Sequence, residues 1–240
     1  MPGAWGAALL DGGRVTLYAV EGGRIAAHDF ASVDGMAKAS GIAAERLVTL
    51  DAAVRGSPPA KTLDVASGTL GALQQAGPAA LLPPEARVLI AGALAAQPDW
   101  DGIMLIPEAD VTHWVHVSAR EIVSFQGAAT GRLAAALGAY GDALDASALS
   151  DTMSRPERLA AHLNAAALTG ASAAVLGHLM GAELAAMRAY WLGQELRIIG
   201  PAAPYAKALE AQGVIAEAVP RAKAWEAGIH ALAEAAGLTG

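Results

Sequence analysis

Three short apolar runs open the chain, and acidic-Gly-Gly triplets separate them. The runs cover residues 6–10, 14–20 and 24–30, and the triplets are Asp11-Gly12-Gly13 and Glu21-Gly22-Gly23. Glycine supplies the positive φ that tight turns need, so such a triplet between apolar runs is typical of a β-hairpin. The pattern predicts a three-stranded antiparallel meander at the N-terminus.

The middle of the chain alternates between expected helices and expected strands. Residues 67–75 and 87–96 have the character of helices, and the second follows a Pro-Pro-Glu sequence. A continuous apolar run at 102–107 predicts a buried strand. The runs at 112–117 and 121–126 predict a second β-hairpin.

From residue 131 onward the pattern is mainly helical. A helix is expected at 155–167, with Ser154 as its cap and Pro156 in its first turn, and a longer helix at 171–192. The remaining segments alternate in type: a strand at 195–199, a helix at 203–212, a strand at 214–218 and a helix at 223–236. This alternation is typical of layered α/β folds.

The length of 240 residues is enough for two lobes that each bury a core. Hydrophobic residues make up 54% of the chain and charged residues 16%, which excludes an intrinsically disordered protein. The expected elements divide into an N-terminal lobe at 1–126, which includes the second hairpin, and a helical C-terminal lobe at 127–240. We place the boundary between these lobes within residues 127–150.

Charge and apolar pattern narrow the compartment and the partners. The chain has no cysteine and opens without a basic signal-peptide region, so we expect a cytoplasmic protein without disulfides. The longest apolar stretch, at 169–187, is interrupted by His178 and Glu183, so no membrane span is expected. The net charge of −7, with no basic stripe, argues against a nucleic-acid partner. Alanine-rich helices are compatible with a homodimer.

Four segments of the C-terminal half carry a resemblance to a known family. They are Gly-His-Leu-Met-Gly-Ala-Glu-Leu-Ala-Ala-Met-Arg at 177–188, Leu-Arg-Ile-Ile-Gly at 196–200, Tyr-Ala-Lys-Ala-Leu at 205–209 and Ala-Trp-Glu-Ala-Gly at 224–228. In this order they resemble the 2-keto-3-deoxygalactonate kinases (2-dehydro-3-deoxygalactonokinases), relatives of the sugar kinases, Hsp70 and actin. The resemblance is strong after residue 100 and weak before it. It implies a two-lobed α/β, ribonuclease H-like fold with a reduced N-terminal lobe.

The resemblance implies a first phosphate-binding turn in the N-terminal hairpin. The family motif Asp-Trp-Gly-Thr-Thr-Asn-Leu-Arg falls on residues 11–18, where Asp11, Gly13 and Leu17 are retained. By this resemblance Asp11 is the catalytic residue, which holds Mg²⁺ or takes the proton of the substrate hydroxyl, and Gly13 and Arg14 contact phosphate. The two hydroxyl residues of the motif are missing here. An ordinary hairpin turn is the alternative interpretation.

A second phosphate-binding turn is implied between the strands of the second hairpin. The family motif Pro-Gly-Thr-His-Thr-Lys-Trp-Val falls on residues 107–115 with one residue inserted, and Thr112 is the candidate phosphate-binding residue. The motif's glycine is replaced by Glu108, and Asp110 adds a second carboxylate. Coulomb repulsion predicts that these carboxylates oppose ATP unless Mg²⁺ bridges them. A purely structural turn is the alternative.

The nucleotide-binding segment of the family is better retained in this chain than the substrate-binding segments. The family segment Arg-Gly-Glu-Glu-Thr-Gln falls on residues 84–89, where none of its polar residues is retained in register. Arg87 and Glu85 are candidate ligands of a sugar acid, and a capped surface turn at the start of a helix is the alternative. The glycine- and tryptophan-rich substrate segment of the family has no counterpart near residues 46–59. The turn after the strand at 195–199 has the form of an adenosine-binding turn. The candidate nucleotide-binding residues are Gly200, Pro201 and, on the preceding helix, Gly181 and Glu183.

The histidines carry little functional signal. His113 and His116 stand three residues apart on an expected strand, so they face opposite sides and are poorly placed to share a metal. His178 lies on an apolar helix, and we expect a core or interface residue whose ring nitrogens have partners.

Two functional hypotheses follow from the resemblance. In the first, the protein is a kinase that uses ATP and Mg²⁺ to phosphorylate a 2-keto-3-deoxy sugar acid, so its ligands are the sugar acid and the nucleotide. In the second, the eroded motifs mark a catalytically inactive paralogue that needs no cofactor and acts as a binding or regulatory protein. A third interpretation, an unrelated α/β fold, conflicts with the shared order and spacing of the matched segments.

Overall fold

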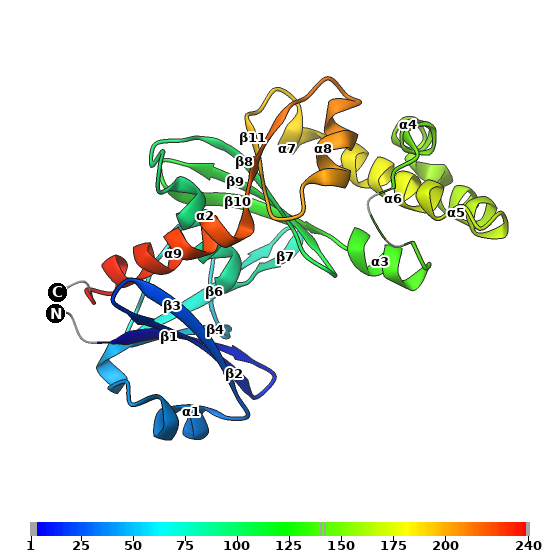
Figure 1. The fold of residues 1–240 in the computed structure, drawn as a ribbon. Helices are drawn as coiled ribbons and strands as arrows, with labels where there is room; N and C mark the ends of the chain where they lie inside the picture. The colour runs from blue at the N-terminus through cyan, green and yellow to red at the C-terminus, as the bar shows by residue number, and fades with distance from the viewer. Residues whose placement is uncertain (1–3, 140, 142, 239–240) are drawn as a thin grey trace. The chain divides into compact units, whose positions relative to one another are not determined.

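The computed structural model describes residues 4–139, 141 and 143–238 (Figure 1). These residues form two compact units, and each unit contains more than one stretch of sequence. Unit 1 takes the described residues of 1–100, 119–123 and 222–240, and unit 2 takes those of 101–118 and 124–221. This division by contacts does not coincide with the predicted boundary within 127–150, because the C-terminal helix belongs mainly to unit 1 and much of the second hairpin to unit 2.

Unit 1 contains a mixed sheet whose order, in the described chain, is β3-β2-β1-β4-β6-β7. The strands are β1 (Trp5–Asp11), β2 (Arg14–Glu21), β3 (Arg24–Phe30), β4 (Leu47–Gly56), β6 (Thr69–Ala76) and β7 (Ala79–Leu82). β1, β2 and β3 form the predicted antiparallel meander. β4 lies parallel to both β1 and β6, so the connections into and out of β4 cross over the sheet.

Two helices supply the core of unit 1. They are α2 (Pro84–Leu94) and α9 (Arg221–Ala235), and Val88 of α2 and Leu232 of α9 pack with Leu50 and Leu70 of the sheet. α2 and α9 approach each other closely because Gly92 lies against the backbone of α9, where a Cβ atom would overlap it. The smaller elements are α1 (Val33–Ser40), which Ser32 caps by accepting a hydrogen bond from the Gly35 amide, and the 3₁₀ turn η1 (Ala44–Arg46).

Unit 2 contains a second sheet, in the order β12-β11-β8-β9-β10. The strands are β8 (Gly102–Pro107), β9 (Thr112–Ser118), β10 (Glu121–Ala128), β11 (Leu196–Ile199) and β12 (Ala216–Val219). The first residues of β10 belong to unit 1, where they pair with β5 (Ala60–Lys61). β12, β11 and β8 are parallel and β9 is antiparallel to β8, so three strand C-termini and the start of β9 lie at one edge of the sheet.

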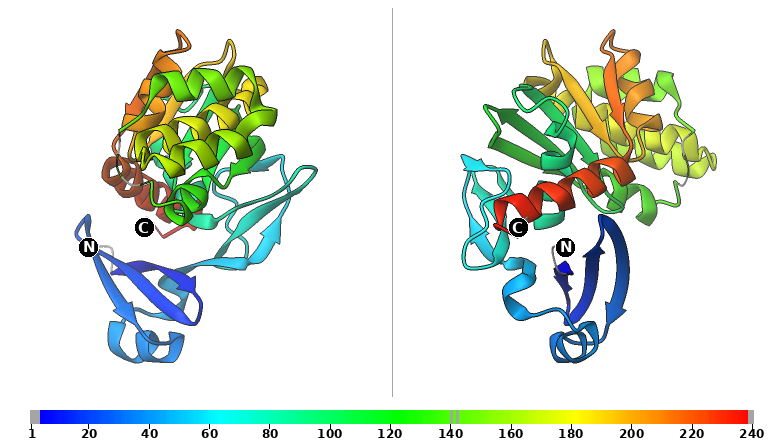
Figure 2. Two further views of the ribbon diagram at one scale, coloured as in Figure 1. Left: turned by 90° about the vertical axis from the view of Figure 1, so that its right-hand side faces the viewer. Right: turned by 60° about the vertical axis from the view of Figure 1, so that its left-hand side comes forward.

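Helices surround the core of unit 2. They are α3 (Thr130–Ala136), α4 (Ala146–Ser154), α5 (Leu159–Leu168), α6 (Ser172–Ala186), α7 (Arg188–Trp191) and α8 (Ala203–Glu210), with the 3₁₀ turn η2 (Pro156–Arg158) between α4 and α5. Leu105 and Trp114 of the sheet pack against Leu184 of α6 and Leu209 of α8. α4 and α5 both pack along α6 (Figure 2). None of the described helices is long and apolar enough to cross a membrane.

Most predicted elements are confirmed, and three need correction. The single helix expected at 171–192 is divided at Met187 into α6 and α7. Residues 67–75 do not form a helix, since most of them belong to the strand β6. The helix was predicted because a short continuous apolar run has no periodicity that distinguishes a buried strand from a helix. The helix expected at 155–167 begins later, at Leu159. Ser154 is the last residue of α4, which Asp145 caps, and Pro156 begins the 3₁₀ turn η2.

Candidate functional site

A pocket of about 490 Å³ opens on unit 1 beside the segment that links β4 to β5. A β-bulge between Asp51 and Arg55 shifts the register of β4 against β6, and the backbone of Val54 passes over Gly71. A side chain at Gly71 would collide with that backbone, so the bulge depends on this glycine. Bulges often redirect side chains next to binding sites. The lining comprises Val54, Arg55, Gly56, Ser57, Pro59, Ala60, Lys61, Asp64, Ala66, Thr69, Gly71, Leu73, Arg87 and Glu121.

Cations predominate slightly among the charged residues of this pocket. Arg55 and Lys61 are exposed at its wall, and Arg55 donates a hydrogen bond to Gln74 Oε1 at 2.8 Å. Asp64 and Glu121 supply the opposing charges. The sequence analysis did not single out Arg55 or Lys61, because the family's substrate motif is not recognisable in this segment.

The predicted substrate residue Arg87 lines the same pocket, but its side chain is committed to the backbone. Its guanidinium donates to the carbonyl oxygens of Lys61 at 2.9 Å, Thr62 at 3.0 Å and Gly71 at 2.6 Å. Burial lowers the pKa of Arg87 to about 10, and Asp64 acts in the opposite direction. Arg87 therefore fixes the wall of the pocket. Glu85 lies in the first turn of the same helix, half-buried.

The first predicted phosphate turn is the β1–β2 hairpin of unit 1. Asp11 and Arg14 pair across this turn and both are exposed. Gly12 and Gly13 have φ values of 54° and 90°, which side chains rarely tolerate. The structure thus places Asp11, Gly13 and Arg14 together at an accessible turn, and their roles stay a prediction.

Three of the predicted phosphate and nucleotide residues of unit 2, Thr112, Gly200 and Pro201, lie at one edge of its sheet, whereas Gly181 and Glu183 lie on α6. Thr112 begins β9, Glu108 follows β8, and Gly200 and Pro201 follow β11. The Gly200 amide donates to the carbonyl oxygen of Val219 at the end of β12 at 3.1 Å, so the turns after β11 and β12 are adjacent. Ligands of open α/β sheets bind at the carboxyl ends of the strands, and this edge has that position.

The two carboxylates that were expected to oppose ATP each face an arginine. Glu108 Oε1 accepts a hydrogen bond from Arg221 Nη1 at 2.7 Å, and Asp110 Oδ2 lies 3.6 Å from Arg132 Nη2. These two pairs offset the negative charge at the β8–β9 turn, so the predicted repulsion of ATP loses its main cause. No motif pointed to Arg132 or Arg221.

Glu183 of α6 lies at the centre of a buried polar network. Its carboxylate accepts hydrogen bonds from Trp114 Nε1 at 2.6 Å, from the Tyr205 hydroxyl at 2.9 Å and from the Thr130 hydroxyl. Burial raises the pKa of Glu183, and the three donors act against that rise. With Glu183 ionised, Tyr205 donates to it and Thr112 donates to Tyr205 at 2.5 Å. The Thr112 hydroxyl is buried in this chain, and its contact with phosphate stays a prediction.

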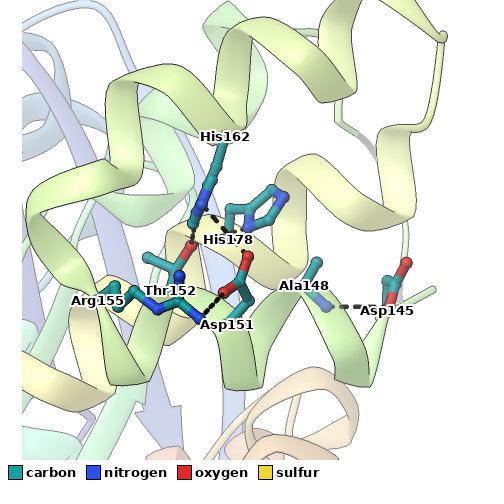
Figure 3. Close-up of polar contacts among 7 residues, drawn as sticks. All are labelled: Asp145, Ala148, Asp151, Thr152, Arg155, His162 and His178. Atoms are coloured by element: carbon teal, nitrogen blue, oxygen red, sulfur yellow. Dashed lines mark hydrogen bonds and ion pairs between the residues drawn. The ribbon is translucent and has the colours of Figure 1, made fainter.

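Gly181 and His178 are placed by helix packing. Gly181 lies against the backbone of Leu149, so α4 and α6 approach closely there. Thr152 Oγ1 lies 2.7 Å from His162 Nδ1 and 2.8 Å from His178 Nδ1, and the two rings are 4.7 Å apart (Figure 3). His178 was expected to have hydrogen-bond partners, and its Nδ1 has one in the Thr152 hydroxyl. His113 is buried, its Nδ1 has no partner among the described residues, and burial lowers its pKa to about 4.

Comparison with known proteins places this geometry in a family. A family model described as 2-keto-3-deoxy-galactonokinase matches residues 85–232, more than half of the chain. A Sinorhizobium meliloti protein provisionally assigned as a 2-dehydro-3-deoxygalactonokinase aligns with a TM-score of 0.77 at 19% identity, over 96% of this chain and 98% of that chain. Component A of the (R)-2-hydroxyglutaryl-CoA dehydratase of Acidaminococcus fermentans aligns with a TM-score of 0.50 at 11% identity, over 98% of this chain and 99% of that chain.

A search of curated protein sequences finds no match. The structural likenesses confirm the predicted fold class, the α/β fold of sugar kinases, Hsp70 and actin. The family match covers α2, the whole sheet of unit 2 and most of α9, in agreement with the strong resemblance after residue 100. The chain belongs to the 2-keto-3-deoxy-galactonokinase family of sugar kinases.

Proposed function

We propose that the protein transfers the γ-phosphoryl group of ATP to a hydroxyl of a 2-keto-3-deoxy sugar acid. The observation that carries this proposal is the gathering of Thr112, Gly200, Pro201 and two arginine–carboxylate pairs at the carboxyl edge of the unit 2 sheet, in a chain of this family. In the reaction the substrate oxygen forms a bond to the γ-phosphorus, the bond to the bridging oxygen breaks, and ADP leaves. The proton of the hydroxyl passes to Asp11 or, where Asp11 holds Mg²⁺, to water.

The pocket of unit 1 suits the sugar acid. Its volume of about 490 Å³ lies within the usual range for small-molecule sites. The substrate is a carboxylate anion at neutral pH, and guanidinium and ammonium groups are its natural partners. We assign the carboxylate to Arg55 and Lys61, since both are exposed at the wall. Arg87 positions the wall through its three backbone hydrogen bonds.

The turn after β11 is assigned to the nucleotide, and the β1–β2 turn to the metal. The turn at Gly200 and Pro201 is assigned to the adenosine. Among the described residues no group of three histidines or carboxylates could hold a metal. Mg²⁺ in kinases is held by one or two carboxylates together with phosphate oxygens and water, so the exposed carboxylate of Asp11 fits it. When bound, Mg²⁺ neutralises charge on the β- and γ-phosphates.

Binding and turnover test the proposal separately. Titration of Mg²⁺–ATP by calorimetry should give a saturable heat, and ligand at about 100 times its Kd should stabilise the fold by roughly 2.7 kcal/mol in a thermal scan. A coupled assay of ADP release should then require a 2-keto-3-deoxy sugar acid. Nucleotide binding without turnover on any such acid would support the inactive paralogue instead, and no binding at millimolar nucleotide refutes the proposal.

A single substitution tests the substrate pocket. Arg55→Gln removes one charge-assisted bond and should raise KM for the sugar acid about 10- to 100-fold, with the Kd for ATP unchanged. Arg24→Gln, an exposed arginine of β3 that does not line the pocket, is the matched control. An unchanged KM in Arg55→Gln rules out this pocket residue.

The homodimer and the cytoplasmic location remain predictions. Light scattering on the purified protein should give twice the mass of one 240-residue chain if the homodimer is correct.

A further inference from the structure

Arg221 and Glu108 form an ion pair at the edge of the unit 2 sheet where strand C-termini meet. Arg221 follows β12 and Glu108 follows β8, and Nη1 lies 2.7 Å from Oε1. Their side chains are 42% and 36% exposed, so a ligand can reach both. Each stands one or two residues beyond the end of its strand, as Gly200 does beyond the end of β11.

We propose that Arg221 binds the phosphates of the nucleotide and that Glu108 holds its guanidinium in place until the nucleotide arrives. The inference rests on the proposed function and adds the residue that supplies positive charge to the eroded second phosphate turn. A guanidinium matches the geometry of phosphate oxygens and remains charged at every physiological pH. A partly exposed ion pair contributes little net stability, so exchanging the Glu108 carboxylate for phosphate costs little.

Arg221 is better placed for this role than Arg132, the other arginine that pairs with a carboxylate of the β8–β9 turn. Val219, two residues before Arg221, accepts a hydrogen bond from the Gly200 amide at 3.1 Å. Arg221 therefore lies next to the turn assigned to the adenosine. Arg132 lies on α3, its contact with Asp110 is longer at 3.6 Å, and both side chains of that pair are more than 60% exposed.

Removal of the Arg221 side chain should weaken the binding of nucleotides that carry phosphates and leave the binding of adenosine almost unchanged. Arg221→Gln should lower the affinity for Mg²⁺–ATP about 10- to 30-fold and leave the affinity for adenosine within about twofold. Glu108→Gln removes the competing carboxylate and should tighten ATP binding about two- to fivefold. Arg155→Gln, which breaks an exposed ion pair with Asp151 of α4 and belongs to none of the proposed binding sites, is the matched control and should change ATP affinity by less than about twofold.

Calorimetry with ATP, ADP, AMP and adenosine on the full chain measures these effects. A wild-type protein that binds no nucleotide refutes the proposed function, and this inference with it. A wild-type protein that binds ATP, together with an Arg221→Gln variant that loses nothing or loses ATP and adenosine equally, overturns this inference alone. If Arg221→Gln fails to fold, Glu108→Gln decides: tighter ATP binding supports the exchange, and unchanged or weaker binding overturns it.

Discussion

Thr152 is a single hydroxyl shared by two histidine rings, and its removal should destabilise the helices of unit 2. Thr152 comes from α4, His162 from α5 and His178 from α6, so this oxygen joins three helices (Figure 3). A hydroxyl has one hydrogen, so Thr152 donates to one ring and accepts from the other. One Nδ1 therefore carries a hydrogen and the other does not, although both face the same oxygen.

Thr152→Val has nearly the same volume, so it removes hydrogen bonds without opening a cavity. Thr152 is fully buried and His162 is 8% exposed, so water does not readily replace the lost partner at His162. An unsatisfied buried group costs about 1–3 kcal/mol, and two ring nitrogens lose their partner. Because the half-buried His178 can recover some solvation, we expect the free energy of unfolding to fall by about 2–4 kcal/mol.

Urea unfolding at neutral pH, followed by circular dichroism, measures this change. Thr152→Ser keeps the hydroxyl and loses one methyl group, so it should cost only about 1 kcal/mol. The reasoning is refuted if the valine variant is as stable as the wild type, or if the serine variant is the less stable of the two.

Three further substitutions probe other buried groups. His113 has a folded-state pKa of about 4 against an unfolded value of 6.5, so the unfolded chain binds the extra proton and stability should fall by about 3 kcal/mol as pH drops from 6.5 to 4; His113→Leu should flatten that part of the curve of unfolding free energy against pH. Gly181→Ala places a Cβ atom against the Leu149 backbone and should cost about 1–3 kcal/mol in urea unfolding, whereas exposed Gly77→Ala, with no atom near the new Cβ, should cost less. The Glu183 carboxylate accepts hydrogen bonds from three donors, and Glu183→Gln replaces one of its two oxygens by an NH2 group that cannot accept. This change should lower the melting temperature more than Tyr205→Phe, which removes one donor.

The fold could be predicted where a signal is local. The β1–β3 meander follows from glycine turns, and β8 follows from a continuous apolar run between polar residues. β6 was missed because its residues are buried by contacts with β4, β7 and α2. Neither β4 nor β7 was predicted as a strand, so no pattern indicated that residues 69–76 pair with them. The N-terminus of α5 was placed too early because Ser154 and Pro156 are good start signals taken separately, while α4 already occupies Ser154.

The candidate site could be predicted only where it follows the family's motifs. Thr112, Gly200 and Pro201 were predicted from motif order and spacing, and their roles stay a prediction, although the sheet topology places them at one edge. Arg55 and Lys61, which line the pocket of unit 1, were not singled out because the family's substrate motif is not recognisable in their segment. The contact between Arg221 and Glu108 was not predicted because 113 residues separate the two in the chain.

The altered second phosphate turn therefore has to be judged by its net charge and not by its motif alone. Glu108 and Asp110 taken by themselves add two negative charges where phosphate should bind, and this was one of the sequence arguments against a kinase. Arg221 and Arg132 bring two positive charges to the same turn, so the local sum is neutral. A neutral turn can be recruited by phosphate, since a guanidinium that leaves a carboxylate for a phosphate exchanges one charge-assisted bond for another. Residues distant in sequence can thus compensate for a motif that has been lost, and the charge of Arg221 is where that compensation can be measured.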